Sequence, residues 1–313
     1  MSFAAIMLVA LLLDIAIGWP DAVYRRIGHP VSWIGAAIDA IEARFNLDED
    51  PPDKRRTFGA IASLAIVGIT ALPTFVIMAM LPEGWLGILL GGILAWPFVA
   101  ARSLYDHVRD VAVPLEQSDL DGARLAVARI VGRNPEALDV PGVARASLES
   151  LAENTSDGVI APLFWGAILG LPGLVAYKAI NTLDSMIGHR TPRFEDFGRF
   201  AARLDDLVNL APARLTGAIM AAVSGAPMRA LRVMWRDAPA HRSPNAGWPE
   251  AALASGLGVR LSGPRIYADH VADEPWLNAS APDPTPASVF QGLSIYRRTM
   301  IATAVCLLAL GLV

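Results

Sequence analysis

The chain has 313 residues, of which 54% are hydrophobic and only 18% are charged. Soluble domains are usually about 45–50% apolar and about 25% charged, so this composition, with a mean hydropathy of +0.42, indicates an integral membrane protein. The formal net charge of −4 argues against nucleic-acid binding. The single cysteine, Cys306, excludes a disulfide or a thiolate metal site within one chain.

Apolar segments recur along the chain and predict an all-α integral membrane protein with about 4–6 membrane helices, some of them short or broken. They lie near residues 3–17, 58–81, 85–101, 158–176, 211–225 and 299–313. The first lacks the basic start and the cleavage site of a signal peptide, so we expect a retained helix. The polar stretches between the segments predict amphipathic helices in cytoplasmic loops. We expect residues 1–313 to form a single domain.

The segment 158–176 contains an unusual number of helix breakers. They are Gly158, Pro162, Gly166, Gly170, Pro172 and Gly173. A broken helix at membrane depth is tolerated only where it lines protein or a water-filled cavity. If every apolar segment crossed the bilayer, the polar stretches 102–157 and 177–210 would lie on opposite sides. We therefore predict that 158–176 and 211–225 are not both ordinary spans, so that the polar groups meet on one side, expected to be cytoplasmic.

Carboxylates, amides and one lysine are concentrated between residues 149 and 214, before and after the broken segment. Polar groups next to hydrocarbon cost free energy unless they are paired or used. This concentration is therefore the main functional clue in the chain. Glu149 and Glu153 are four residues apart and share a helix face, and Asp157 lies near that face if the helix continues.

The sequence lacks the signatures of several enzyme classes. It has no Walker-type Gly-x-x-x-x-Gly-Lys-Ser/Thr loop, no His-Glu-x-x-His zinc motif and no Gly-x-Ser-x-Gly elbow. What it has is a region rich in oxygen ligands, with Lys178 and several arginines, which suits Mg²⁺ and a phosphate-bearing ligand. The alternative is a set of interhelical salt bridges. For any single acid, a salt bridge explains its presence as well as a functional site does. For the whole set it explains less, because neutral side chains would pack the helices together with a smaller desolvation cost.

Long sequence blocks of rare composition extend from residue 11 to residue 261. They are LLLDIAIGWPD, IGHPVSWIG, SLAENTSDGVIAPLFW, YKAINTLDSMIGHR, DFGRFAARLDDLVNLAPAR and SPNAGWPEAALASGLGVRL. In these blocks the chain resembles the CobD/CbiB family of cobalamin-biosynthesis membrane proteins, the adenosylcobinamide-phosphate synthases. The resemblance covers nearly the whole chain.

The resemblance implies an ATP-dependent carbon–nitrogen ligase of vitamin B12 synthesis, a multi-pass protein of the bacterial inner membrane with its active side in the cytoplasm. The implied reaction joins aminopropanol or its phosphate to a side-chain carboxylate of (adenosyl)cobyric acid, giving (adenosyl)cobinamide or its phosphate. ATP and Mg²⁺ are implied by the family and by no motif in the chain. The implied partners are the corrinoid, the aminopropanol compound, the lipid bilayer and other late B12-pathway membrane proteins, with no nucleic acid.

A carboxylate acylates an amine only after activation, for example as an acyl phosphate, and activation needs cations near phosphate oxygens. We assign hypothetical roles by residue type and clustering. The catalytic candidates are Glu149, Glu153, Lys178 and Asp184. The metal candidates are Glu153, Asp157, Asp205 and Asp206, and an acid of the whole set could instead take the proton of the incoming ammonium. The substrate-binding candidates are His29, Asn154, Asn181, Arg203, Arg214, Asn245 and Glu250.

Two other functions fit parts of the sequence. The block His-Pro-Val-x-x-Ile-Gly resembles one in AmpE-type membrane proteins, which would make the chain a sensor or a regulator. Broken apolar segments with nearby acids also fit a transporter of a corrinoid or a small cation. The ENTSDG and SPNAGWPEA blocks favour the cobalamin branch and the enzyme. His29, at the turn before Pro30, has a structural interpretation that is simpler than a ligand-binding one.

Overall fold

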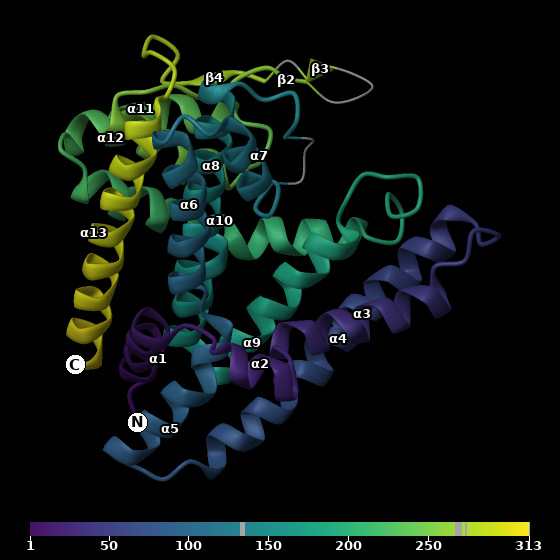
Figure 1. Cartoon of the computed structure of the whole chain (residues 1–313). Coiled ribbons are helices and arrows are strands. Elements are labelled where there is room, and N and C mark those ends of the chain that lie inside the picture. Colours follow the sequence, from purple (N-terminus) through teal and green to yellow (C-terminus); the bar gives the residue numbers. More distant parts are fainter. Residues whose placement is uncertain (132–134, 267–270, 273, 313) are drawn as a thin grey trace. The chain divides into compact units, whose positions relative to one another are not determined.

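The computed structural model describes residues 1–131, 135–266, 271–272 and 274–312 and consists almost entirely of helices (Figure 1). It forms two compact units. Unit 1 comprises Met1–Ala100, Ala161–Asn209 and Cys306–Val313, and unit 2 comprises Ala101–Ile160 and Leu210–Val305. The expectation of a single domain over the whole chain stays a prediction.

Unit 1 is a helical bundle whose core lies where α3, α4, α9 and the start of α10 pack together. Its elements are α1 (Phe3–Ile17), α2 (Asp21–Ile27), α3 (Pro30–Phe45), α4 (Pro52–Met80), α5 (Trp85–Ala95), the 3₁₀ turn η1 (Trp96–Phe98), α9 (Ala161–Ile187) and the first part of α10 (Arg199–Val223). The buried core side chains include Ile38, Ile66, Leu183 and Phe197, and each contributes about 1.5–3 kcal/mol through burial. This packing fixes α9 and α10, the two helices that hold the polar residues described below.

Two glycines shape unit 1. Gly170 breaks α9 with a φ of +68°, a backbone conformation in which a side chain is strained. The break falls inside segment 158–176, which confirms the prediction of a broken helix. Gly59 of α4 lies against the backbone just before α10, where an added Cβ would be only 1.9 Å from the carbonyl oxygen of Phe197. The two elements approach this closely because Gly59 has no side chain.

Unit 2 contains the remaining helices and four two-residue strands. The elements are α6 (Ala101–Glu116), α7 (Leu120–Val127), α8 (Val140–Asn154), the π-helix η2 (Thr155–Ile160), the end of α10, α11 (Pro227–Asp237), the 3₁₀ turn η3 (Ala238–Ala240), α12 (Gly247–Leu257), β1 (Leu261–Ser262), β2 (Arg265–Ile266), β3 (Val271–Ala272), β4 (Trp276–Leu277) and α13 (Pro286–Gly311). Strand β1 pairs antiparallel with β4, and β2 pairs antiparallel with β3. Helix α13 is tied to the start of α6 by a hydrogen bond of 2.8 Å from the Tyr296 hydroxyl to the Ala101 carbonyl.

The described residues include four helical segments that are long and apolar enough to cross a membrane. They are Pro52–Met80, Trp85–Glu116, Val140–Ile187 and Pro286–Gly311. The pair Phe3–Ile17 and Asp21–Phe45, which bends by 108°, adds a fifth if its two helices together form one broken span. On α4 the large side chains Leu72, Phe75 and Val76 are exposed, as expected for a lipid-facing surface. The prediction of an all-α membrane protein with about 4–6 membrane helices is confirmed.

Three expected segments differ from the structure in where a helix ends or continues. The segment expected at 85–101 ends as α5 at Ala95, because Pro97 leads into the turn η1. The segment expected at 211–225 is not separate, since α10 continues through Pro212, and α10 is not among the described candidate spans. The segment expected at 299–313 is the end of the 26-residue helix α13, whose polar first half, with Arg297 and Arg298, lowers the local hydropathy.

Candidate functional site

The last turns of α9 present a polar face on the side away from the unit 1 core. Leu183 and Ile187 pack into that core. Lys178, Asn181 and Asp184 follow one another every three residues on the other side, which places them on one stripe of the helix. The Lys178 ammonium donates to Oδ1 of Asn181 at 3.4 Å. A cation, an amide and a carboxylate therefore share this stripe.

Asp205 of α10 is buried, with 8% of its surface exposed. Its Oδ2 accepts a hydrogen bond of 2.9 Å from the side-chain amide of Asn209, and Oδ1 of Asn209 accepts one of 2.9 Å from the Tyr177 hydroxyl. The other carboxylate oxygen, Oδ1 of Asp205, is buried and has no hydrogen-bond partner among the described residues. A carboxylate in this position is poorly compensated and holds a proton more readily than one in water.

The proton affinity of Asp205 reflects its surroundings. Burial raises its pKa to about 7, and the negative charge of Asp184 adds to the rise. The hydrogen bond from Asn209 and a weaker contact from Asn181 oppose it. Desolvation also raises the pKa of Asp206, whose charge acts on Asp184. The three acids form one interacting group, and Asp205 exchanges its proton near neutral pH, where a general base is most effective.

His29 belongs to the same part of unit 1, because the charge of Lys178 acts on its ring. Its Nδ1 accepts a hydrogen bond of 3.2 Å from the Val31 amide and so caps the start of α3. The ring also packs edge-on against Trp19, with the ring centroids 5.2 Å apart. These contacts support the structural interpretation of His29, and its role in substrate binding stays a prediction.

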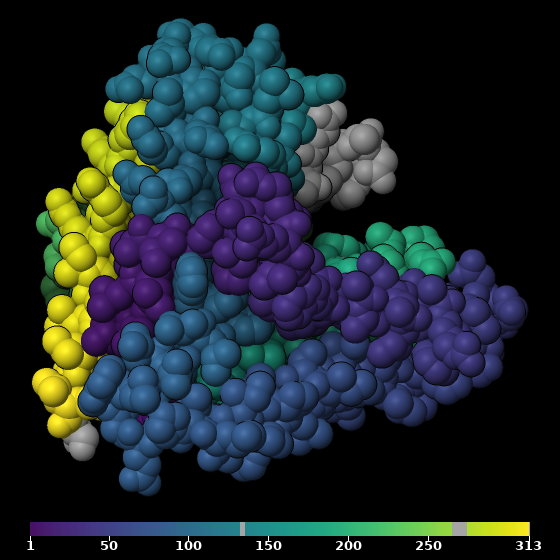
Figure 2. All heavy atoms as spheres, turned by 60° about the horizontal axis from the view of Figure 1, so that its bottom comes forward, coloured from purple at the N-terminus to yellow at the C-terminus, as the bar shows by residue number. Residues whose placement is uncertain are grey.

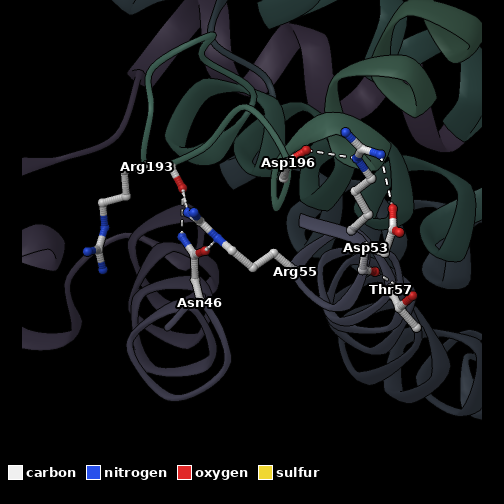
Figure 3. A network of polar contacts seen from close by, with 7 residues as sticks. Asn46, Asp53, Arg55, Thr57, Arg193 and Asp196 are labelled. Carbon is white, nitrogen blue, oxygen red and sulfur yellow. Dashed lines mark hydrogen bonds and ion pairs between the residues drawn. The ribbon is translucent and has the colours of Figure 1, made fainter. Parts of the chain in front are cut away.

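The loop between α9 and α10 is anchored on the hairpin of α3 and α4. Figure 2 shows the green atoms of this region lying against the indigo atoms of the hairpin. The Arg193 carbonyl accepts a hydrogen bond of 3.0 Å from the Asn46 amide and another from the Arg55 guanidinium (Figure 3). Arg56 of α4 pairs with Asp196 at 2.8 Å. The loop is therefore held in one conformation by contacts at several points.

A cavity of about 320 Å³ lies beside this loop. Its lining includes His189, Arg190, Asp196, Arg199, Arg203 and Asp206. The predicted substrate-binding residue Arg203 and the metal candidate Asp206 thus face the same space. Because Asp206 also belongs to the interacting acids, the cavity adjoins the group around Asp205.

In unit 2, the acids expected to share one helix face differ in environment. Glu149 is buried, and its Oε1 accepts a hydrogen bond of 2.8 Å from the Ser262 amide on β1. Glu153 and Asn154 are exposed, and the Asn154 amide donates to the backbone of its own helix at 3.0 Å. Asp157 lies in the π-helix η2. The α-helix itself ends at Asn154, and the place of Asp157 near the face of Glu149 and Glu153 stays a prediction.

The other predicted residues of unit 2 lie around the start of α12. The Arg214 guanidinium lies over the Trp248 ring, 4.3 Å from its centroid. Glu250 and His241 are both buried, and their Oε2 and Nε2 atoms are 3.6 Å apart. Asn245 is buried in the same segment. This region thus combines a stacked arginine with a buried acid that faces a histidine.

The predicted residues thus divide between the units. Unit 1 holds His29, Lys178, Asn181, Asp184, Arg203, Asp205 and Asp206. Unit 2 holds Glu149, Glu153, Asn154, Asp157, Arg214, Asn245 and Glu250. Convergence of the two sets into one pocket stays a prediction.

The described part of the chain contains no group of three or more His, Cys, Asp or Glu side chains arranged to hold a metal ion. A Mg²⁺ ion bound by protein ligands alone therefore does not fit these residues. A Mg²⁺ ion that arrives with substrate phosphates needs only one or two carboxylates. Asp184 and Asp206, which interact electrostatically, fit this smaller demand.

Some residues of these sites had no role in the sequence interpretation. Tyr177 and Asn209 orient Asp205, and the signal for Asn209 was its spacing of four residues from Asp205 on a helix. His189 and Arg190 line the cavity and end the YKAINTLDSMIGHR block. His241 was one of five scattered histidines. The one sequence signal for its contact with Glu250 was that it lies shortly before the block SPNAGWPEA, which contains Glu250.

Comparison with known proteins gives one consistent result. The sequence model of the family described as "CobD/Cbib protein" matches residues 7–296. A protein of Rhodobacter capsulatus named "Cobalamin biosynthesis protein CobD" is 61% identical over 313 residues, which cover 100% of this chain and 98% of that protein. Proteins of the same name from Brucella suis and from a Sinorhizobium species are each 48% identical, over 279 and 280 residues. Those two matches cover 87% of this chain and 85% and 87% of the relatives. No solved structure matches the chain.

Proposed function

The chain belongs to the CobD/CbiB family of cobalamin-biosynthesis proteins, and on that premise we propose that it forms an amide bond between a corrinoid and an amino alcohol. The corrinoid supplies a side-chain carboxylate of cobyric acid or its adenosyl form. The amine comes from aminopropanol or its phosphate. The product is the corresponding cobinamide or cobinamide phosphate.

The buried Asp205 supports this reaction most directly. An amine attacks an activated carboxyl group only after its ammonium form has lost a proton. Asp205, with a pKa raised by burial to about 7, is ionised in part of the molecules at neutral pH and accepts that proton readily. Asn209 and Tyr177 hold the accepting carboxylate in place. We assign Asp205 the role of general base, a role left open among the acids of the set.

The activation step also has suitable residues nearby. A carboxylate becomes an acylating agent when it takes a phosphoryl group, here from ATP with release of ADP, and the amine then displaces phosphate. Lys178 and Arg203 provide positive charge for the phosphate oxygens, and Asn181 provides an amide for a corrinoid edge. A Mg²⁺ ion brought by the nucleotide would be held by Asp184 and Asp206 and would neutralise phosphate charge.

Product analysis tests this proposal. Purified protein in lipid nanodiscs is supplied with adenosylcobyric acid, ATP and Mg²⁺, and with either aminopropanol or its phosphate. Mass spectrometry should show a new corrinoid that has gained the amino alcohol with loss of water, and the donor that reacts identifies the substrate. In a deletion strain, cobyric acid should accumulate and added cobinamide should restore growth. Restoration of growth by cobyric acid would place the block at an earlier step and refute the proposal.

A transporter is the second candidate, because α9 is broken at Gly170 and α1 meets the following helices at a bend of 108°. It predicts corrinoid movement across proteoliposomes without a new covalent product. Loading vesicles with cobyric acid and analysing both compartments separates the two functions, since only the enzyme yields cobinamide. For the enzyme, we propose an inner-membrane location with the active side in the cytoplasm, where ATP is available.

A further inference from the structure

The cavity beside the loop between α9 and α10 has an unusual concentration of arginine. Arg190 comes from the loop, and Arg199 and Arg203 come from the first turns of α10. His189 contributes an imidazole next to them. Arg199 and Arg203 are four residues apart, so one face of the helix presents both guanidinium groups to the same space.

These arginines are not paired with carboxylates, unlike several other arginines of the described chain. The side chains of Arg199 and Arg203 form no hydrogen bond or ion pair within the described residues, and both are exposed. Arg190 has only an electrostatic influence on Asp206. By contrast, Arg56 at the cavity wall is paired with Asp53 at 3.2 Å and with Asp196 at 2.8 Å. Three guanidinium groups are therefore available to a ligand.

The acids in the lining do not cancel this charge. Asp196 is neutralised by its pair with Arg56, and Glu195 is exposed to solvent. Asp206 is the remaining acid, and it is one carboxylate against three guanidinium groups. The backbone adds to the effect, because α10 begins at Arg199 and the start of a 25-residue helix has a positive end. The cavity therefore favours an anion.

The anchoring of the loop shows that this arrangement is formed in advance. The contacts of Arg193 with Asn46 and Arg55 fix the middle of the loop. The close approach of Gly59 to Phe197 fixes its last residues. The backbone that carries these arginines is therefore fixed before a ligand binds, and only the arginine side chains remain to be ordered on binding. Planar guanidinium groups suit phosphate oxygens in particular, because each can donate two parallel hydrogen bonds.

We propose that the cavity of His189, Arg190, Arg199 and Arg203 is a binding site for the phosphate group of a phosphorylated small molecule. The volume of about 320 Å³ admits more than a phosphate alone, so the rest of the molecule has room as well. The phosphate belongs to the ester of the amino alcohol or to a nucleoside triphosphate. The assignment of the phosphate to one of these two compounds rests on the proposed function, whereas the phosphate site itself does not.

Equilibrium binding of radiolabelled inorganic phosphate to the purified protein in nanodiscs tests the site. The wild-type protein should bind phosphate, and R199Q and R203Q should each weaken binding by about tenfold or more, the value of a charge-assisted hydrogen bond. R199K keeps the charge and loses the planar fork, so its loss should be smaller than that of R199Q. The matched control is R232Q, since Arg232 is also exposed and unpaired on a described helix outside the cavity. It should bind like the wild type.

Competition then identifies the source of the phosphate. Aminopropanol phosphate and ATP are each added to protein that carries labelled phosphate, and the compound that displaces it at the lower concentration is the ligand. Absence of phosphate binding to the wild type, or equal binding by R199Q, R203Q and R232Q, would overturn the site. If these variants lose phosphate binding while no donor yields an amide product, the site stands and the proposed function fails. If product forms and phosphate binding is unchanged in both variants, the function stands and the site fails.

Discussion

The buried acids of the two units are compensated very differently. In unit 2 three buried or partly buried acids each face a single partner of their own. Glu149 accepts from the Ser262 amide, Glu250 faces His241, and Arg236 holds the pKa of Asp237 below its usual value. In unit 1, Asp205 shares its surroundings with two other acids, and one of its oxygens is buried without a hydrogen-bond partner among the described residues.

We expect this difference to separate acids that hold the fold from acids that can exchange a proton. A buried charge with a donor stabilises the structure and resists changes in protonation. A buried acid among other acids costs stability and gains a pKa suited to proton transfer.

Replacement of Asp205 by asparagine should abolish most of the activity. The amide keeps the shape of the side chain but cannot accept the proton, and loss of a general base costs about 100-fold or more. Cobinamide formation by D205N, followed by mass spectrometry, gives the effect directly. The matched control is D110N, because Asp110 is an exposed acid paired with Arg129 and should be dispensable. Equal rates for D205N and D110N would contradict the assigned role.

The same residue should make stability fall as the pH rises. The pKa of Asp205 is about 7 in the folded protein, against about 3.9 in an unfolded chain. Between these values the folded state binds the extra proton, so this contribution is complete below about pH 4 and is lost as the pH rises through about 7. Melting of D205N in detergent should therefore depend less on pH than melting of the wild type, with D205N the more stable at pH 8. Parallel curves would show that Asp205 titrates normally.

Replacement of Glu149 should lower the stability of the protein and leave its activity unchanged, in contrast to replacement of Asp205. E149A leaves the Ser262 amide without its acceptor, and an unsatisfied buried group costs about 1–3 kcal/mol. Thermal unfolding should show this loss, while E149Q, which keeps an acceptor oxygen, should lose less. Product formation per folded molecule should be unchanged in E149Q. A collapse of activity in stable E149Q protein would return Glu149 to the catalytic set, where residue type alone had placed it.

The smallest effect is expected at an exposed ion pair of unit 2. Arg129 and Asp110 are 2.9 Å apart, and both side chains are more than half exposed. Pairs of this kind contribute about 0–1 kcal/mol. R129A should therefore melt close to the wild type, and the difference should shrink further in added salt. A loss of stability as large as that of E149A would show that the exposure of an ion pair does not determine its contribution to stability in this protein.

The helical fold followed from the sequence where composition determines structure. The apolar run 3–17 is α1 with the same bounds, and the glycines and prolines of 158–176 do mark a break. Hydropathy did not predict the helix bounds where one long helix contains both polar and apolar stretches. Because of its arginines, the first half of α13 was not predicted as part of the apolar helix. The apolar end of α10 was predicted as a separate segment because the start of that helix is polar.

Part of the candidate site could be predicted from the sequence. The concentration of polar residues between 149 and 214 singled out Lys178, Asn181 and Asp184 as candidates. It could not show that Asp205 is buried while its neighbour Asp206 is exposed, because burial depends on which helix packs against which face. Nor could the sequence separate Glu149, which accepts from a distant strand, from an acid that is available for catalysis.

The central claim is that Asp205 takes up a proton near neutral pH. Infrared difference spectroscopy of the protein in nanodiscs, titrated from acid to alkaline pH, reports the carbonyl stretch of protonated carboxyl groups. We predict a component that disappears with a midpoint of about 7 and is missing from D205N. Identical titrations of the wild type and D205N, with every carboxyl group ionised by about pH 5, within the usual range for Asp and Glu, would contradict the claim.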